Sequence, residues 1–141
     1  ELAVAVLDGK LYAVGGYMDG DFSSVERYDP AVSAWEAVAP MAEERWRLAI
    51  AVLDGKLYVA GGSGAVAGHS RLSSVERYDP TENAWEAVAP MAAAREAPAV
   101  AVLDGKLYIV GGENDEDGDL SSVERYDPGT DAWEAVAPLT L

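Results

Sequence analysis

The stretch VLDGKLY at residues 52–58 decides the fold, together with the Gly-Gly at 61–62, SSVERYDP at 73–80 and AWEAVAP at 84–90 that follow it. The same four segments recur on both sides of this copy, and VLDGKLY begins again at Val6 and at Val102. Between the double glycine and the Ser-Ser lie 6, 10 and 8 residues in the three copies, whereas the remaining frame has 40 residues each time. A constant frame with one variable loop is typical of repeat proteins, because each unit packs on its neighbours and accepts insertions at one face.

Each frame predicts four β strands, since none of its four apolar stretches has the length or the 3.6-residue spacing of a helix. Asp8-Gly9 is a strong signal for a two-residue hairpin, and Pro30 ends the third strand of the first copy. Glu36 and Pro40 disfavour pairing with a further strand, so we expect the fourth strand to lie at the outer edge of the sheet. The strands expected in the first copy are 2–7, 10–15, 24–28 and 34–38.

Four-stranded antiparallel sheets repeated every 40 to 50 residues predict the blades of an all-β propeller. The lettering also resembles the Kelch repeat: a Gly-Gly closes the second strand, Tyr-Asp-Pro follows the third, a Trp lies seven residues beyond that Tyr, and Pro-Met precedes an Arg. This resemblance covers essentially the whole chain, as three blades at about 1–46, 47–96 and 97–141. The recurring glycines and aromatics, expected to be structural, are Gly15, Gly16, Gly61, Gly62, Gly111, Gly112, Tyr28, Tyr78, Tyr126, Trp35, Trp85 and Trp133.

The number of blades implies a partner, because propellers need about four to eight blades to surround a channel. Six is a blade number known for Kelch propellers, so the resemblance implies that two chains close one ring as a homodimer. When Glu1 is aligned with Arg47 and Leu141 with Glu43, three positions, 44–46, stay open between successive copies. We therefore expect the third blade of one chain to pack on the first blade of the other.

Charge and composition limit the classes of partner that the chain could bind. The chain has a formal net charge of -15, which opposes capture of nucleic-acid phosphates or anionic lipid, although solubility alone explains much of it. No apolar run reaches a membrane span and no signal peptide begins the chain, so a soluble protein is expected. The absence of cysteine excludes disulfides and is compatible with the cytoplasm, but it does not determine the compartment.

Unrepeated residues are expected to gather on one face, formed by the loops 17–22, 63–72 and 113–120 and the connections 42–48 and 92–98. In Kelch-like substrate adaptors of ubiquitin ligases this face binds peptides, and guanidinium groups suit an acidic peptide. Two of the arginines, Arg45 and Arg95, align with each other, so a loop brace is an equal alternative for them. The candidate partner-binding residues are Tyr17, Arg45, Trp46, Arg47, His69, Arg71 and Arg95.

The acidic loop has the spacing of a calcium-binding loop, with oxygens at Glu113, Asp115 and Asp117 and then Glu124. Against a metal, the first position is Glu, no helices flank the loop, and Glu124 belongs to the repeated frame. We expect no metal and no cofactor.

Catalysis has little support. His69 is the one histidine, and its neighbour Ser70 is not part of a triad. Copper oxidases of the Kelch fold need a cysteine and several histidines, and no specific carboxylate pair indicates a glycosidase.

Two non-enzymatic functions remain. The nearly verbatim frame with loops of three lengths favours a designed, consensus-type scaffold that self-assembles and presents variable loops on one face. The alternative is a Kelch substrate-recognition module that binds a peptide segment of a protein partner through the same loops.

Overall fold

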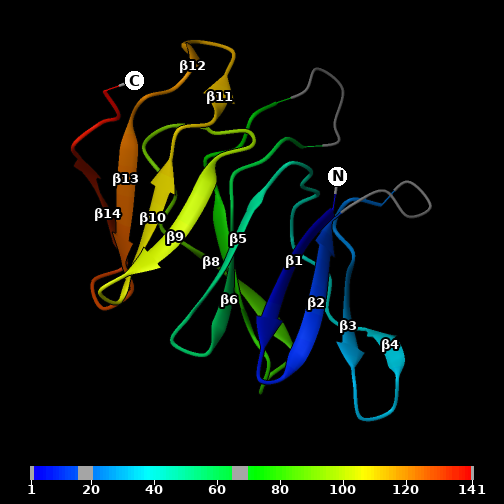
Figure 1. Ribbon diagram of the computed structural model, residues 1–141. Coiled ribbons are helices and arrows are strands. Elements are labelled where there is room, and N and C mark those ends of the chain that lie inside the picture. The colour runs from blue at the N-terminus through cyan, green and yellow to red at the C-terminus, as the bar shows by residue number, and fades with distance from the viewer. Residues whose placement is uncertain (1, 16–20, 65–69, 141) are drawn as a thin grey trace.

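The computed structural model describes residues 2–15, 21–64 and 70–140, which form three four-stranded antiparallel sheets (Figure 1). The first sheet holds β1 (Leu2–Leu7), β2 (Lys10–Gly15), β3 (Val25–Asp29) and β4 (Ala34–Ala37) in that order. The second holds β5 (Ala49–Leu53), β6 (Lys56–Ala60), β7 (Val75–Asp79) and β8 (Ala84–Val88). The third holds β9 (Ala99–Leu103), β10 (Lys106–Val110), β13 (Val123–Asp127) and β14 (Ala132–Val136). The prediction of an all-β propeller built from four-stranded blades is confirmed.

The strands begin and end close to the expected residues. β1 and β2 match their predicted bounds, whereas β3 starts and ends one residue later than predicted and β4 stops one residue earlier. One element was not predicted, a short hairpin of β11 (Glu113–Asn114) and β12 (Gly118–Asp119) inside the acidic loop. Among the described residues no helix could cross a membrane.

The Asp-Gly hairpins form as expected. Asp8 and Gly9 have φ values of 51° and 72°, so both central residues are left-handed, as a two-residue type I′ turn requires. Asp54-Gly55 and Asp104-Gly105 repeat this geometry. The turn fixes the register of each sheet, because it pairs the last residue of the first strand with the first residue of the second.

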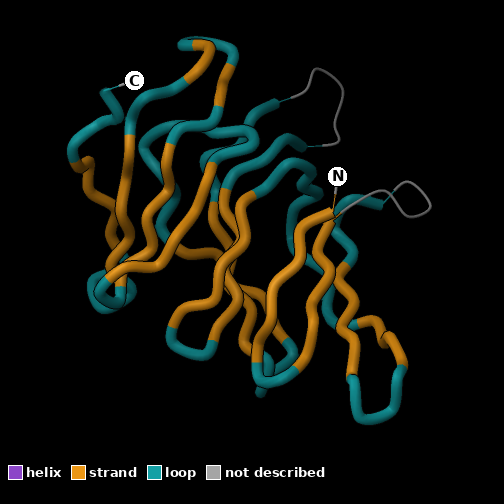
Figure 2. Tube along the Cα trace, in the orientation of Figure 1, coloured by secondary structure: helices purple, strands orange, loops and turns teal. Residues whose placement is uncertain are grey.

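The three sheets stand side by side, with their first strands adjacent and their fourth strands outermost (Figures 1 and 2). β5 contacts β1 on one side and β9 on the other. All four residues of β4 are exposed, in agreement with the outer edge predicted for it. Arg27, Arg77 and Arg125, on the third strand of each sheet, each pair with the glutamate opposite on the fourth strand.

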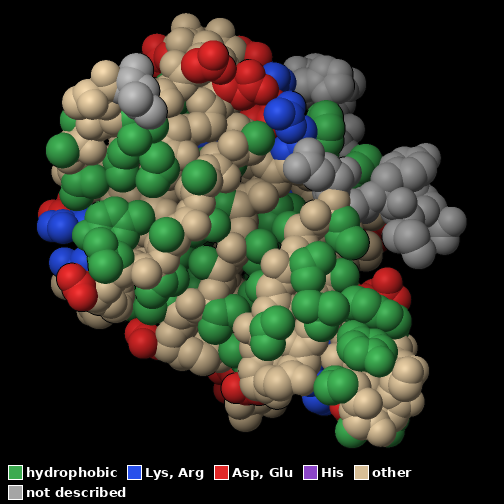
Figure 3. Space-filling model, in the orientation of Figure 1, with side chains coloured by type: hydrophobic (Ala, Val, Ile, Leu, Met, Phe, Trp, Pro, Cys, Tyr) green, Lys and Arg blue, Asp and Glu red, His purple; other side chains and the backbone are tan. Residues whose placement is uncertain are grey.

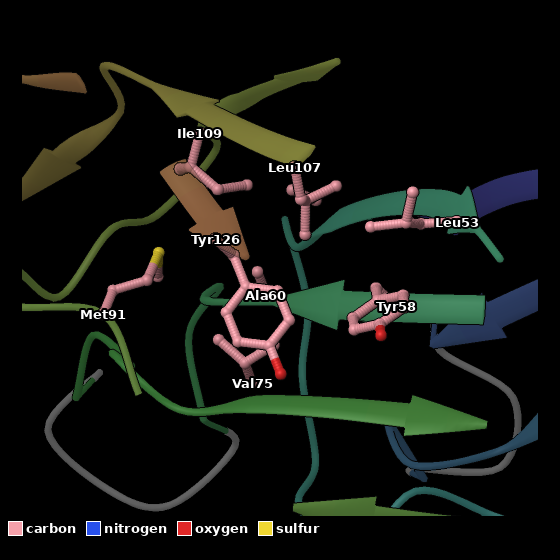
Figure 4. Close-up of a cluster of buried hydrophobic side chains, with 9 residues drawn as sticks. Leu53, Tyr58, Ala60, Val75, Met91, Leu107, Ile109 and Tyr126 are labelled. Carbon is pink, nitrogen blue, oxygen red and sulfur yellow. The ribbon is translucent and has the colours of Figure 1, made fainter. Parts of the chain in front are cut away.

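Apolar side chains between neighbouring sheets form the core. Between the second and third sheets, Tyr58, Val75 and Met91 face Leu107, Ile109 and Tyr126 (Figure 4). The same layer recurs between the first two sheets. In both layers two tyrosine rings from different sheets meet in a tilted arrangement, with centroids 5.8 Å apart. Burying each large apolar side chain contributes about 1.5–3 kcal/mol, so the sheets depend on their neighbours for stability.

Polar contacts also link each sheet to the one before it. The indole N–H groups of Trp85 and Trp133 donate to the carbonyl oxygens of Ala39 and Ala89 at 2.8 and 2.7 Å. In return, the backbone N–H of Ala89 donates to the Asp131 carboxylate at 2.9 Å, and Ala39 is bound in the same way by Asn83. Trp85 and Trp133 therefore link each of the last two sheets to the sheet before it.

Glycine is required where the chain turns out of β6. Gly61 has a φ of 64°, and a Cβ atom there would lie 2.4 Å from the carbonyl oxygen of Arg95. Gly55 has a φ of 70°, but a Cβ atom there would meet nothing within 4 Å. The first position therefore combines backbone strain with crowding, whereas the second has strain alone.

These two glycines make a matched pair for mutation. Gly55→Ala should lower the free energy of unfolding by about 1–2 kcal/mol, the cost of a left-handed residue with a Cβ. Gly61→Ala should cost about 1–3 kcal/mol more, because the backbone of the next connection must move. Denaturant unfolding of both variants measures the difference, and equal losses would contradict the crowding at Gly61.

The hydrogen bond between Asp131 and Ala89 predicts that the stability of the fold falls at acidic pH. The Ala89 N–H, and then the Tyr126 hydroxyl, hold the pKa of Asp131 below its usual range. A depressed pKa adds stability above the unfolded value, and this stability is lost as the pH falls through the folded value. Asp131→Asn, which copies Asn83 of the second repeat, should therefore flatten the fall in thermal midpoint below pH 4, whereas Asn83→Asp should steepen it.

Candidate functional site

The described parts of the variable loops and the connections between sheets meet at one end of the molecule, opposite the tight hairpin turns (Figure 1). Backbone hydrogen bonds link the connections to the loops. Trp46 and Ser63 exchange two hydrogen bonds of 3.0 and 2.8 Å, and Glu96 and Glu113 exchange two of 2.9 and 3.0 Å. Each connection thus pairs with the loop of the following blade. We call this end the loop face.

Two of the candidate arginines lie beneath the loop face and are fully buried. The Arg45 guanidinium donates to the Glu76 carboxylate at 3.1 Å and to the Gly61 carbonyl oxygen at 3.0 Å. Arg95 makes the equivalent bonds to Glu124 and Gly111 in the third sheet. Both side chains therefore bind the following sheet inside the fold, which is the structural alternative that was given for them besides ligand contact.

The other two described arginines converge on a single carboxylate. Glu96 is buried, and its two oxygens lie 2.7 Å from Arg47 Nη1 and 2.6 Å from Arg71 Nε. Glu113 and Asp115 extend the cluster, at 3.4 Å from Arg47 and 3.7 Å from Arg71. We call these five residues the ion-pair cluster. It compensates both arginines within the chain, so an acidic ligand would have to compete with Glu96.

Trp46 lies at the margin of this cluster. Its side chain is partly buried, and the Arg47 guanidinium carbon lies 5.9 Å from the centre of its ring, within the range of a cation–π contact. The expected sites at Tyr17 and His69, like the structural glycine at Gly16, lie outside the described residues.

A polar hollow of about 390 Å³ opens beside the ion-pair cluster. Figure 3 shows acidic and basic side chains gathered at this end of the molecule. Arg71 lies on one side, and the carboxylates of Asp115 and Asp117 lie along the β11–β12 loop. Asn114 holds this loop in place, since its side chain accepts from two backbone N–H groups of the loop and donates to the Ala94 carbonyl oxygen at 3.0 Å. The hollow has the size and polarity to take a short peptide segment or a charged side chain.

The calcium spacing noted in the acidic loop is not assembled into a site. The Glu124 carboxylate accepts from the backbone of Ala92 and Ala93 and pairs with Arg95, beneath the loop. Across residues 2–15, 21–64 and 70–140, no three His, Asp or Glu side chains gather in a way that could hold a metal ion.

Sequence reasoning missed Glu96 and Asn114. Glu96 follows the repeated Arg95 at the position where the preceding repeat has Trp46, so its signal was an unrepeated carboxylate among unrepeated arginines.

Comparison with known proteins shows similarity to Kelch repeats in sequence and to a solved structure in fold. A family model described as the Kelch motif matches residues 1–42, 47–92 and 94–140. The human "Kelch repeat and BTB domain-containing protein 13" is 48% identical over 44 residues, which are 30% of this chain and 10% of that protein. The solved structure of YjhT superposes on this chain with a TM-score of 0.84 at 20% sequence identity. The superposition covers 99% of this chain and 50% of the YjhT chain. The chain thus spans only part of the length of each.

The ion-pair cluster predicts unequal roles for its carboxylates. Glu96→Gln should lower the free energy of unfolding by about 2–4 kcal/mol, because two guanidinium groups lose a buried partner. Glu113→Gln should cost less than about 1 kcal/mol, because that carboxylate is far more accessible than Glu96, at 39% against 2%. Chemical denaturation measures both, and similar effects would show that Glu96 does not organise the cluster.

Proposed function

Because this chain belongs to the Kelch-repeat family, we propose that it acts without catalysis, as half of a six-bladed ring that a second copy completes. The completed ring presents the variable loops on one face. The observation that carries this proposal is the pair of apolar faces on the outer sides of the first and third sheets. The large apolar residues exposed there correspond, by repeat, to residues that are buried or packed between the other sheets.

The outer face of the first sheet repeats a contact that the second sheet already makes. Val4, Val6 and Trp35 occupy the positions of Ile50, Val52 and Trp85, which pack against the first sheet. On the first sheet these positions are exposed, with 65% of Val6 and 48% of Trp35 accessible. This face is therefore shaped to receive a preceding blade.

The outer face of the third sheet offers the complement. Leu103 and Leu139 occupy the positions of Leu53 and Met91, which are buried in the core between the second and third sheets. Both are exposed here. Contiguous apolar surface of this kind marks an interaction site. A third blade placed against a first blade would reproduce the layer found twice within the chain, and the match to half the length of YjhT supports the same arrangement.

We propose a consensus-type, self-assembling scaffold as the leading function, since the frames are nearly identical and only the loops vary. Recognition of a peptide from a protein partner is the second candidate. The hollow beside Arg71 favours it, because it combines a guanidinium group, an amide and carboxylates at one opening. A peptide-array screen with the wild type and Arg71→Gln separates the two, since a scaffold without a ligand would select no sequence.

Ring closure predicts the mass of the assembly. Native mass spectrometry should give a species of twice the 14.9 kDa chain. Val6→Lys should weaken this dimer at least about tenfold, because it places a charge in an apolar interface. Val32→Lys is the matched control, since Val32 is as exposed, at 69%, but lies in the β3–β4 turn. A monomer at all concentrations, or a multiple other than two, would overturn the proposal.

A further inference from the structure

The buried arginines of the second and third sheets reveal a socket that is repeated in the chain. In each case the arginine comes from the connection that precedes the sheet, and the sheet supplies the acceptors: a Glu carboxylate, a Ser hydroxyl and carbonyl, and a Gly carbonyl. Arg45 reaches the Ser74 carbonyl oxygen at 2.9 Å and its Oγ at 2.8 Å. Arg95 reaches those of Ser122 at 3.0 and 2.9 Å. This set of several acceptors around one side chain matches the many donors of a guanidinium group.

The first sheet carries the same acceptors. Glu26, Ser24 and Gly15 occupy the positions of Glu76, Ser74 and Gly61. Their backbone has the same conformation, because the N–H of Gly15 donates to the Ser24 carbonyl oxygen at 3.0 Å, against 3.1 Å for the pair Gly61 and Ser74. The φ of Gly15 is 68°, against 64° at Gly61. The socket is therefore already formed.

Within residues 2–15, 21–64 and 70–140, no cation fills this first socket. The Glu26 carboxylate has neither a hydrogen bond nor an ion pair with any described residue, whereas Glu76 and Glu124 each bind an arginine. Beside it lies a hollow of about 280 Å³, lined by Leu2, Ala13, Gly15, Ser24, Glu26 and Trp35. A partly buried carboxylate beside unused carbonyl and hydroxyl acceptors attracts a donor of positive charge.

We propose that Glu26, Ser24 and Gly15 form a binding site for the guanidinium group of an arginine that a partner segment supplies. The two filled copies define the chemistry of that segment, in which a Pro-Met pair precedes the arginine by the spacing of Pro40, Met41 and Arg45. Lysine is a poorer occupant, because an ammonium group has three donors on one nitrogen whereas the guanidinium group reaches these acceptors from separate nitrogens. The site lies on the same outer face as Trp35, but its affinity for arginine does not depend on ring closure.

The segment that supplies the arginine must place it as the connections within this chain place Arg45 and Arg95. In the alignment of the repeats, Leu141 corresponds to Glu43, so the position of Arg45 has no counterpart in the third repeat of this sequence. The tripeptide Glu-Arg-Trp, which copies residues 44–46, covers the three positions that would stay open in a closed ring. It therefore fits the socket in a monomer and in a closed dimer alike.

The test is a titration of the ¹⁵N-labelled chain with the N-acetylated, C-amidated tripeptide Glu-Arg-Trp, followed by NMR at the amides of Gly15 and Ser24. The control peptide has citrulline in place of arginine, which keeps the shape and removes the charge. We expect the arginine peptide to bind at least about tenfold more tightly. Equal affinities of the two peptides, or no binding of either, would overturn the proposal.

Two variants of the chain complete the test. Glu26→Gln should lose the preference for arginine, whereas Glu36→Gln, an exposed change in the same sheet, should keep it. Glu26→Gln should also leave the unfolding midpoint unchanged, because Glu26 has no partner to lose in the described part of the chain, whereas Glu76→Gln should lower it by leaving Arg45 without its carboxylate. A stability loss at Glu26 as large as that at Glu76 would show that the first socket is already filled.

The same samples separate this inference from ring closure. Arginine-selective binding by a species of one chain mass would uphold the socket and contradict the ring. A species of two chain masses that does not distinguish arginine from citrulline would do the reverse.

Discussion

The arrangement of the molecule depends on a buried arginine that crosses from one blade into the next. Arg45 leaves the connection after the first sheet and ends against Glu76 of the second, and Arg95 repeats this step into the third. An ion pair withdrawn from water gives little net stability, but losing either partner is costly, so the pair acts chiefly as a requirement on geometry. A blade whose neighbour is displaced would keep a buried charge without compensation. Neighbouring sheets are therefore held in one relative position.

The apolar layers and the indole hydrogen bonds of Trp85 and Trp133 also hold neighbouring sheets in one relative position. Tyr58 and Tyr126 meet across one boundary between sheets, as Tyr12 and Tyr78 do across the other. Each layer uses one face from each sheet, so a sheet at the end of the chain keeps one face without a partner. Among the described residues, the apolar outer faces and the exposed Trp35 correspond to positions of the boundary that the chain makes twice between its own sheets.

The sequence predicted the strands and their order well, because the signals are local and appear three times. Asp8-Gly9 fixes a hairpin and its register within a few residues, and three copies reveal which features belong to the frame. The loop face was harder to predict, because its contacts join separate connections. Arg47 and Arg71 looked available as cationic contacts, but both converge on Glu96, and only the folded chain brings the three together. The β11–β12 hairpin was not predicted either, since its acidic sequence has no alternation of apolar and polar residues.

The two apolar outer faces differ from each other, since one matches the start of a blade boundary and the other its end. A contact between unlike faces is head-to-tail, and the rotation from one blade to the next decides whether such contacts close or continue. Small shifts at the Gly61 turn, where the backbone of Arg95 passes closely, would accumulate over successive chains. The close approach of this turn to the next connection therefore helps to set the rotation between two blades, and with it the geometry of any head-to-tail contact between copies.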